Sequence, residues 1–248
     1  MLIEQSAYAN RWRQVSPSAK ALFAAGGFLA AFAAGAPQAA VAVTGVLATT
    51  TLVGAGIPAG RYLRIALPAL FFLSISCLSL AISLNINHGT EGLSFSLAPT
   101  GLTKVAEVGA RSLGALAALL FLVLTTPLID LIAVLRRLKT PEVLLELMVL
   151  CYRMLFVFSE AMRDTVTAQS ARLGYATPRL ALRSLGGLAA NLTLQVWQRA
   201  HGLHVAAQAR NNDGPLLFLE PVFKNAQRDI VIAAMSSGVL LTLVLTLS

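Results

Sequence analysis

Five long runs of apolar residues divide the chain. They cover residues 21–35, 39–57, 65–84, 105–134 and 230–247. A helix needs about 20 predominantly apolar residues to cross a bilayer, so this pattern predicts about five transmembrane helices. The first run is short and is separated from the second only by Ala36-Pro37-Gln38, which favours a tight helical hairpin. The fourth is unusually long and contains Thr125-Thr126-Pro127, where we expect the helix to kink.

The stretch between the fourth and fifth runs has a different pattern, because it carries a charge every few positions. Apolar residues in its first half keep the spacing of one helical face, at Leu144, Leu147, Met148, Cys151, Met154, Leu155, Phe158 and Met162. Residues 179–210 repeat the pattern with Leu182, Leu185, Ala189, Leu192, Val196, Ala200 and Leu203. Charges at this density are costly in hydrocarbon, so the sequence predicts two long amphipathic helices outside the bilayer.

Composition supports a membrane protein: 56% of the 248 residues are hydrophobic, 12% are charged, and the mean hydropathy is +0.73. The net charge of +8 reflects Lys and Arg gathered before the first run, between the second and third, and after the fourth. By the positive-inside rule these flanks are cytoplasmic, so we expect the amino terminus inside and the carboxyl terminus outside, and no nucleic-acid partner.

We therefore predict an all-α polytopic membrane protein with about five transmembrane helices and two long cytoplasmic amphipathic helices. The expected organisation is an amino-terminal transmembrane part (residues 1–135), a cytoplasmic part (136–228) and a carboxyl-terminal transmembrane helix (229–248).

Both amphipathic helices are expected to end in nearly the same short sequence motif, which we call the Ala-Arg phrase. The first reads Ala168-Gln169-Ser170-Ala171-Arg172 and the second Ala207-Gln208-Ala209-Arg210. An arginine at the carboxyl end of a helix is favoured by the helix dipole, which makes a simple cap one explanation. A guanidinium beside small side chains is equally suited to bidentate pairing with a carboxylate on another protein. The residues alone leave both explanations open.

Other candidate chemistry is sparse. His201 and His204 are spaced to share a metal on a helix, but only Asp213 is near enough in sequence to be a third ligand, and His88 is alone in an external loop. We expect no metal site in this chain. Asp130 is the carboxylate at the end of the fourth run, and we expect it to pair with Arg136 or Arg137 and to orient the first amphipathic helix.

In these motifs the chain resembles the transmembrane (T) component of energy-coupling factor ABC transporters, and in particular its cobalt-transport members. The residues that carry the resemblance are, in order, Thr125-Thr126-Pro127, Leu131, Leu135-Arg136-Arg137-Leu138, Pro141, Tyr152-Arg153 and the two Ala-Arg phrases. Trp12, the stretch Ser16-Pro17-Ser18-Ala19-Lys20, and Arg111 also fit. The resemblance thus covers most of the chain.

The resemblance implies a subunit of the bacterial inner membrane, without catalysis or cofactor of its own. Such a subunit couples cytoplasmic ABC ATPases (CbiO-like), which bind ATP and Mg, to a membrane substrate-capture protein (CbiM-like), which binds cobalt. A small accessory membrane protein (CbiN-like) is a further expected partner. The family's two X-Arg-X coupling motifs, which dock into ATPase grooves, would be Ala171-Arg172-Leu173 and Ala209-Arg210-Asn211. The family more often has glycine after the arginine, so Leu173 and Asn211 leave the local backbone geometry open.

Other functions remain as alternatives. A T subunit for nickel or a vitamin would look similar. A conventional ABC permease usually offers one ATPase-coupling loop and carries the substrate path itself, whereas the predicted spans hold few polar residues. A membrane-embedded protease or lipid-modifying enzyme would need paired acids or a similar constellation, and the sequence offers none.

Overall fold

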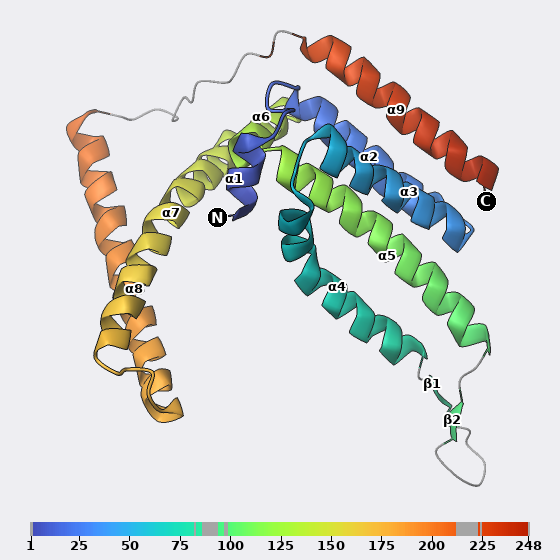
Figure 1. The fold of residues 1–248 in the computed structure, drawn as a ribbon. Coiled ribbons are helices and arrows are strands. Elements are labelled where there is room, and N and C mark those ends of the chain that lie inside the picture. The colour runs from blue at the N-terminus through green and yellow to red at the C-terminus, as the bar shows by residue number, and fades with distance from the viewer. Residues whose placement is uncertain are drawn as a thin grey trace. The chain divides into compact units, whose positions relative to one another are not determined.

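A computed structural model of the chain describes residues 2–81, 83–85, 94–96, 99–211, 223 and 225–247. Nearly all of these residues are helical, and the chain divides into two compact units (Figure 1). The first unit comprises Met1–Val134 with Pro221–Ser248, and the second comprises Leu135–Glu220. The prediction of an all-α polytopic membrane protein is confirmed.

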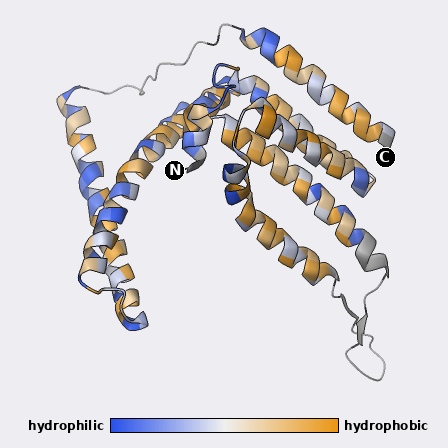
Figure 2. Ribbon diagram, viewed as in Figure 1, coloured by the Kyte–Doolittle hydropathy of each residue, from blue (hydrophilic) through white to orange (hydrophobic). Residues whose placement is uncertain are grey.

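The first unit holds the membrane-spanning helices. Its elements are α1 (Leu2–Ala9), α2 (Pro17–Ala33), α3 (Pro37–Thr49), the π-helical turn η1 (Thr50–Gly54), α4 (Ala59–Ala81), the short antiparallel strands β1 (Ser83–Asn85) and β2 (Ser94–Ser96), α5 (Pro99–Thr125), most of α6 (Leu128–Arg137) and α9 (Ala226–Leu247). Among the described residues, four segments are long and apolar enough to cross a bilayer: Pro37–Gly54, Ala59–Leu80, Lys104–Thr125 and Ala226–Thr246. α2 is apolar but shorter, and the hydropathy colours show the same apolar helices (Figure 2).

Local sequence explains where the first hairpin begins and turns. The Ser16 hydroxyl accepts a hydrogen bond from the Ala19 amide and caps α2, with Pro17 in the first helical position. Pro37 starts α3 in the same way, and the residue before it, Ala36, is extended as the proline requires. The predicted tight hairpin between the first two runs is therefore what the chain forms.

α5 is the central helix of the first unit, since α1, α2, α3 and α4 all pack against it. Small residues bring the helices close together. A Cβ placed on Gly26 of α2 would collide with Cβ of Ser237 on α9, and one on Gly114 of α5 would lie 2.5 Å from Cβ of Ala31 on α2. The two glycines thus allow close helix contacts in this alanine-rich unit.

Three features depart from the sequence prediction. The fourth run does not form one kinked helix: α5 ends at Thr125 and a separate helix, α6, begins at Leu128. The third span begins at Ala59, so Arg61 and Arg64 lie within a helix rather than in a loop. α1 was not predicted, because eight residues of mixed polarity give no clear period.

The second unit is a helical hairpin formed by α7 (Glu142–Ala171) and α8 (Pro178–Ala209), which pack on each other. Among its described side chains, the buried hydrophobic ones are Leu145 and Leu188. Many other apolar side chains remain exposed, among them Leu155 at 62%, Leu182 at 74% and Trp197 at 75%. Apolar exposure on this scale marks a surface that meets a partner or lipid.

We expect Gly26→Ala and Gly114→Ala to destabilise the first unit by about 1 to 3 kcal/mol relative to Gly45→Ala, because the added methyl groups overpack helix contacts. Gly45 is the matched control: it is helical, and a Cβ there would meet nothing within 4 Å. Denaturant unfolding of the detergent-solubilised protein measures the difference. Equal stability in all three variants would contradict close packing at Gly26 and Gly114.

Candidate functional site

The residues singled out in the sequence lie in two places. Thr125, Thr126, Pro127 and Asp130 form the junction between α5 and α6 in the first unit. The two Ala-Arg phrases form the carboxyl ends of α7 and α8 in the second unit.

Pro127 interrupts the helical hydrogen bonds of the backbone at the α5–α6 junction. Proline has no N–H, and the interruption leaves the last carbonyls of α5 without helical partners. The amide of Thr126 still donates to the Leu122 carbonyl at 3.0 Å, whereas the Leu124 and Thr125 carbonyls are contacted by side chains from other segments. Other parts of the chain must supply donors for them, because an unpaired buried carbonyl is costly.

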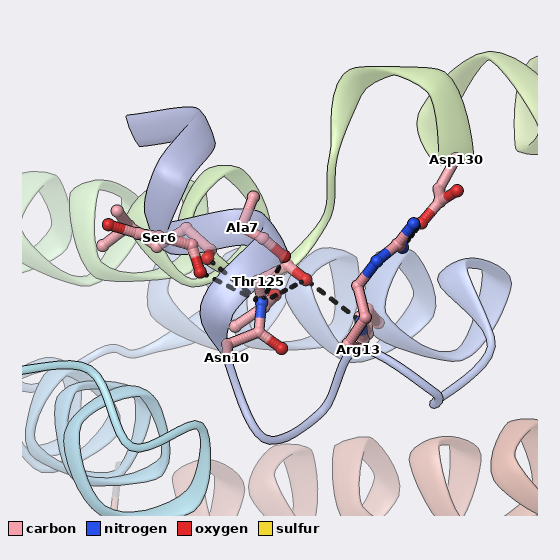
Figure 3. Close-up of polar contacts among 8 residues, drawn as sticks. Ser6, Ala7, Asn10, Arg13, Thr125 and Asp130 are labelled. Carbon is pink, nitrogen blue, oxygen red and sulfur yellow. Dashed lines mark hydrogen bonds and ion pairs between the residues drawn. The ribbon is translucent and has the colours of Figure 1, made fainter. Parts of the chain in front are cut away.

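Two polar side chains close this helix end. Nδ2 of Asn10, just after α1, donates to the Thr125 carbonyl at 3.0 Å and lies 3.5 Å from the Leu124 carbonyl (Figure 3). Nζ of Lys20, on α2, donates to the Thr125 carbonyl at 3.0 Å. Lys20 is only 3% exposed, so its ammonium is committed to the negative end of the α5 dipole.

Asp130 pairs with Arg13, which lies between α1 and α2 (Figure 3). The sequence favours Arg136 or Arg137 as the partner of Asp130 and gives no sign of Arg13, because Arg13 and Asp130 are far apart in the chain. Asp130 is 2% exposed and sits in the first turn of α6, where the helix dipole favours a carboxylate. The Arg13 guanidinium also lies over the Tyr8 ring, 5.0 Å from its centroid.

Titratable groups of α1 border this ion pair. Desolvation raises the pKa of the Tyr8 phenol, and the nearby Glu4 and Asp130 carboxylates add to the effect. Desolvation likewise raises the pKa of the Glu4 carboxyl. Tyr8 is therefore neutral at physiological pH, and its ring is available to the Arg13 guanidinium.

A fifth residue ties α9 to the same region. Oδ2 of Asp229, in the first turn of α9, accepts a hydrogen bond from the Ser16 amide at 3.0 Å. We define the junction cluster as Asn10, Arg13, Lys20, Asp130 and Asp229. Its two cations and two carboxylates balance, and it links α2, α5, α6 and α9 at the point where α6 leads toward the second unit.

The other predicted supporting residues lie around the junction or beyond it. Thr126 and Pro127 are buried, and Thr126 Oγ1 has no hydrogen-bond partner among the residues described. Arg136 lies in the last turn of α6 and Pro141 is the N-cap of α7. Arg153 is exposed on α7.

We call the carboxyl end of α7 or α8, with its capping arginine and the residue that follows, a tip. At the first tip, α7 ends at Ala171 and Arg172 is its C-cap. The Gly174 amide donates to the Gln169 carbonyl at 2.9 Å, and the Leu173 amide donates to the Ser170 carbonyl at 3.0 Å. These two bonds define a Schellman motif, in which the residue after the cap is left-handed. Leu173 accordingly has φ of 56°.

The second tip repeats this geometry as far as it is described. α8 ends at Ala209, Arg210 is the C-cap, and the Asn211 amide donates to the Gln208 carbonyl at 3.0 Å. Asn211 has φ of 50°. The left-handed position explains why glycine usually follows the arginine in the resembled family: only glycine adopts this conformation without strain, and asparagine tolerates it better than leucine.

The glutamines of the two phrases are not equivalent. Counted back from the C-cap arginine, Gln169 is three residues away and Gln208 two. Gln169 ties the first tip together: its Nε2 donates to the Ser184 carbonyl on α8 at 3.0 Å, and its Oε1 accepts from the Tyr175 hydroxyl at 2.7 Å. The Ser184 hydroxyl donates to the Gly174 carbonyl at 2.8 Å. What the two phrases share is therefore the Ala-Arg cap.

Arg172 and Arg210 are both exposed, and neither has an ion-pair partner within the part of the chain that the structure describes. The residues that were weighed as metal ligands, and for which we expected no metal site, give less information. His201 and His204 are exposed on α8, while His88 and Asp213 lie outside the described residues. No group of three or more His, Cys, Asp or Glu side chains able to hold a metal occurs in the described part of the chain.

In the sequence, Arg13 counted only as a cytoplasmic charge and Lys20 also as part of the stretch 16–20 that fits the resemblance, while Asn10, Tyr175 and Ser184 were not singled out. One signal was present: Lys20 follows Ser16-Pro17 immediately before an apolar run, where a charge is costly without a partner. The partner itself, a backbone carbonyl, has no signature in sequence.

We expect Asp130→Asn to cost about 2 to 3 kcal/mol of unfolding free energy, because it leaves the Arg13 guanidinium beside a buried group without charge. Glu107→Gln is the matched control, since Glu107 pairs with Arg111 at 2.8 Å in a partly exposed i,i+4 bridge and should cost less than about 0.5 kcal/mol. Denaturant unfolding in mixed micelles measures both. Similar losses would contradict a special role for the Asp130 pair.

We expect Leu173→Gly to stabilise the first tip by about 1 kcal/mol, because it relieves a left-handed residue that carries a Cβ. The measurement is hydrogen exchange of the Gly174 amide, which should slow by about fivefold. Asn211→Gly, the control at the second tip, should change exchange less. Faster exchange in Leu173→Gly would show that the leucine is not strained.

The chain is similar to known proteins over most of its length. Residues 9–217 match the family CbiQ, described as cobalt transport protein. The cobalt transport protein CbiQ of Rhodobacter capsulatus is 35% identical over 246 residues, which cover 96% of this chain and 98% of that protein.

Two archaeal relatives align over smaller shares. A putative fused cobalt transport protein CbiMQ of Methanocorpusculum labreanum is 29% identical over 86% of this chain, which corresponds to 37% of the fused protein. An uncharacterized protein of Methanocaldococcus jannaschii is 37% identical over 45% of this chain and 42% of its own length. The family match over most of the chain and the full-length relative show that this chain is a member of the CbiQ family of cobalt transport proteins.

Proposed function

We propose that the chain is the transmembrane coupling (T) subunit of an energy-coupling factor ABC importer for cobalt. In this role it passes ATP-driven motion from cytoplasmic ATPase subunits to a membrane-embedded substrate-capture protein. The observation that carries the proposal is the pair of exposed arginines, without an ion-pair partner among the described residues, that cap α7 and α8 with the same backbone geometry. A simple capping role needs no exposed partner surface, whereas a docking role does.

Coupling requires that the ATPases bind different arrangements of the two tips with different strength. Nucleotide binding can move the membrane part only if one arrangement of the two tips binds the ATPases better than another. Arg172 and Arg210 each present a guanidinium suited to a bidentate bond with a carboxylate on an ATPase groove. Closure of the ATPase dimer would then shift α7 and α8 relative to one another.

The junction cluster is suited to carry such motion. α6 begins at a break in the backbone, so it can change direction without disturbing helical hydrogen bonds within α5. Asp130 and Arg13 hold α6 to the segment between α1 and α2, and Lys20 and Asn10 hold the end of α5. A displacement of α6 would thus be transmitted to the end of α5 and to the segment between α1 and α2, which these contacts hold in place.

The partners follow from surface chemistry and from the relatives. The exposed apolar side chains of α7 and α8 suit a membrane protein that slides during transport, which we assign as a CbiM-like capture subunit. The name of the fused CbiMQ relative supports this pairing. CbiO-like ATPases would bind Arg172 and Arg210, and a CbiN-like protein is a further partner. The proposed location is a plasma membrane with the amino terminus in the cytoplasm and the carboxyl terminus outside.

We expect Arg172→Glu and Arg210→Glu each to abolish cobalt uptake by cells that express the whole importer, because a carboxylate in place of the guanidinium repels the acidic groove. Arg199→Glu is the control, since Arg199 is exposed on α8 but does not lie at a tip. Radiolabelled cobalt uptake is measured alongside the amount of each variant in the membrane. Full uptake by both tip variants would contradict the proposal.

A further inference from the structure

The two tips share their backbone but differ in one side chain. Leu173 and Asn211 both follow the capping arginine in the left-handed conformation. Lys139, at the end of α6, is the other non-glycine residue with positive φ among those described. Lys139 and Asn211 are polar and exposed, as expected for residues at helix ends. Leu173 is apolar and is 71% exposed.

Neither local stability nor packing explains a leucine at this position. The left-handed conformation brings its Cβ too close to the following carbonyl, which glycine would avoid and asparagine would tolerate. Its side chain is too exposed to be held in this conformation by packing within the chain. A bulky residue in such a conformation calls for a reason outside the helix hairpin.

The turn holds Leu173 rigidly in place. Gln169, Tyr175 and Ser184 join the end of α7, the turn and the start of α8 through the three hydrogen bonds already described. A Cβ on Gly174 would lie 2.7 Å from Ser184 Oγ and 2.9 Å from the Gln169 carbonyl, so the turn is closely packed at Gly174. A side chain presented by a rigid turn loses little conformational freedom when it binds a partner.

The charges around Leu173 indicate the partner. Arg172 precedes it, and Arg179 follows in the first turn of α8, a turn that contains no acidic residue. A cation at the amino end of a helix opposes the helix dipole, so Arg179 does not serve the stability of α8. Both arginines are exposed, so Leu173 lies along the chain between two exposed cations.

We propose that Leu173 is an apolar anchor of the first tip, which inserts into an apolar recess bordered by carboxylates on the cytoplasmic ATPase. This inference rests on the proposed function and deepens it, because it makes the two tips chemically unequal. The first tip binds through Arg172 and a buried leucine, and the second through Arg210 and a polar asparagine. Gln169, Tyr175 and Ser184 are positioning residues that fix the anchor beside Arg172.

The test measures binding of the purified CbiO-like ATPase of the same importer to the full-length chain in nanodiscs. Leu173→Asn keeps the left-handed conformation and matches the residue of the second tip, and we expect it to weaken binding by about tenfold or more, the usual scale for losing a buried leucine. Leu173→Met restores an apolar side chain of similar volume and should bind within about threefold of the original chain.

Stability provides a second readout that separates anchoring from a structural role. Leu173→Asn should leave hydrogen exchange at Gly174 unchanged or slower, while it weakens binding. If Leu173→Asn binds as tightly as the original chain while Arg172→Glu does not, the anchor is wrong and the proposed function stands. If the original chain itself does not bind the ATPase, the proposed function fails and the anchor fails with it.

Discussion

The architecture depends on how the end of α5 is closed. Pro127 ends the helical hydrogen bonding inside a membrane protein, where water is scarce and each free carbonyl needs a donor. Asn10 and Lys20 supply those donors from two separate segments, and the Arg13–Asp130 pair fixes the helix that follows. One interrupted helix therefore holds the amino-terminal segment, α2 and α6 in a defined arrangement. A continuous α5 would need none of these contacts, but it would also offer no separate α6.

The second unit follows a different physical rule. α7 and α8 bury little of their apolar surface against each other, so their stability and their function depend on what covers them. Their carboxyl ends are the opposite: each is a compact turn with a defined backbone and an exposed arginine. The hairpin thus combines adaptable sides with rigid tips. This combination fits a part that must slide along one partner while it stays attached to another.

The sequence predicted most elements because hydrophobic periodicity and helix caps are local. The apolar runs, the proline-initiated hairpin and the two amphipathic helices all followed from residues within a few positions of each other. The partner of Asp130 did not follow from nearby residues, because Arg13 is distant from Asp130 in sequence and Arg136 is closer. The sequence predicted a kink at Thr125-Thr126-Pro127 rather than two separate helices. It shows the missing proline amide, but not the side-chain donors that satisfy the free carbonyls at the end of α5. The left-handed backbone at Leu173 was hidden for a related reason: leucine gives no sign of a conformation that the surrounding turn imposes.

The most direct test of the central claim, that the chain joins ATPases to a second membrane protein, is to identify what accompanies it. A carboxyl-terminal tag allows purification from the native membrane in mild detergent, followed by mass spectrometry of the recovered proteins. The account predicts an ABC ATPase together with a separate multi-span membrane protein that carries cobalt. Recovery of the chain alone under conditions that preserve other membrane complexes would contradict it, and the exposed arginines would then be simple helix caps.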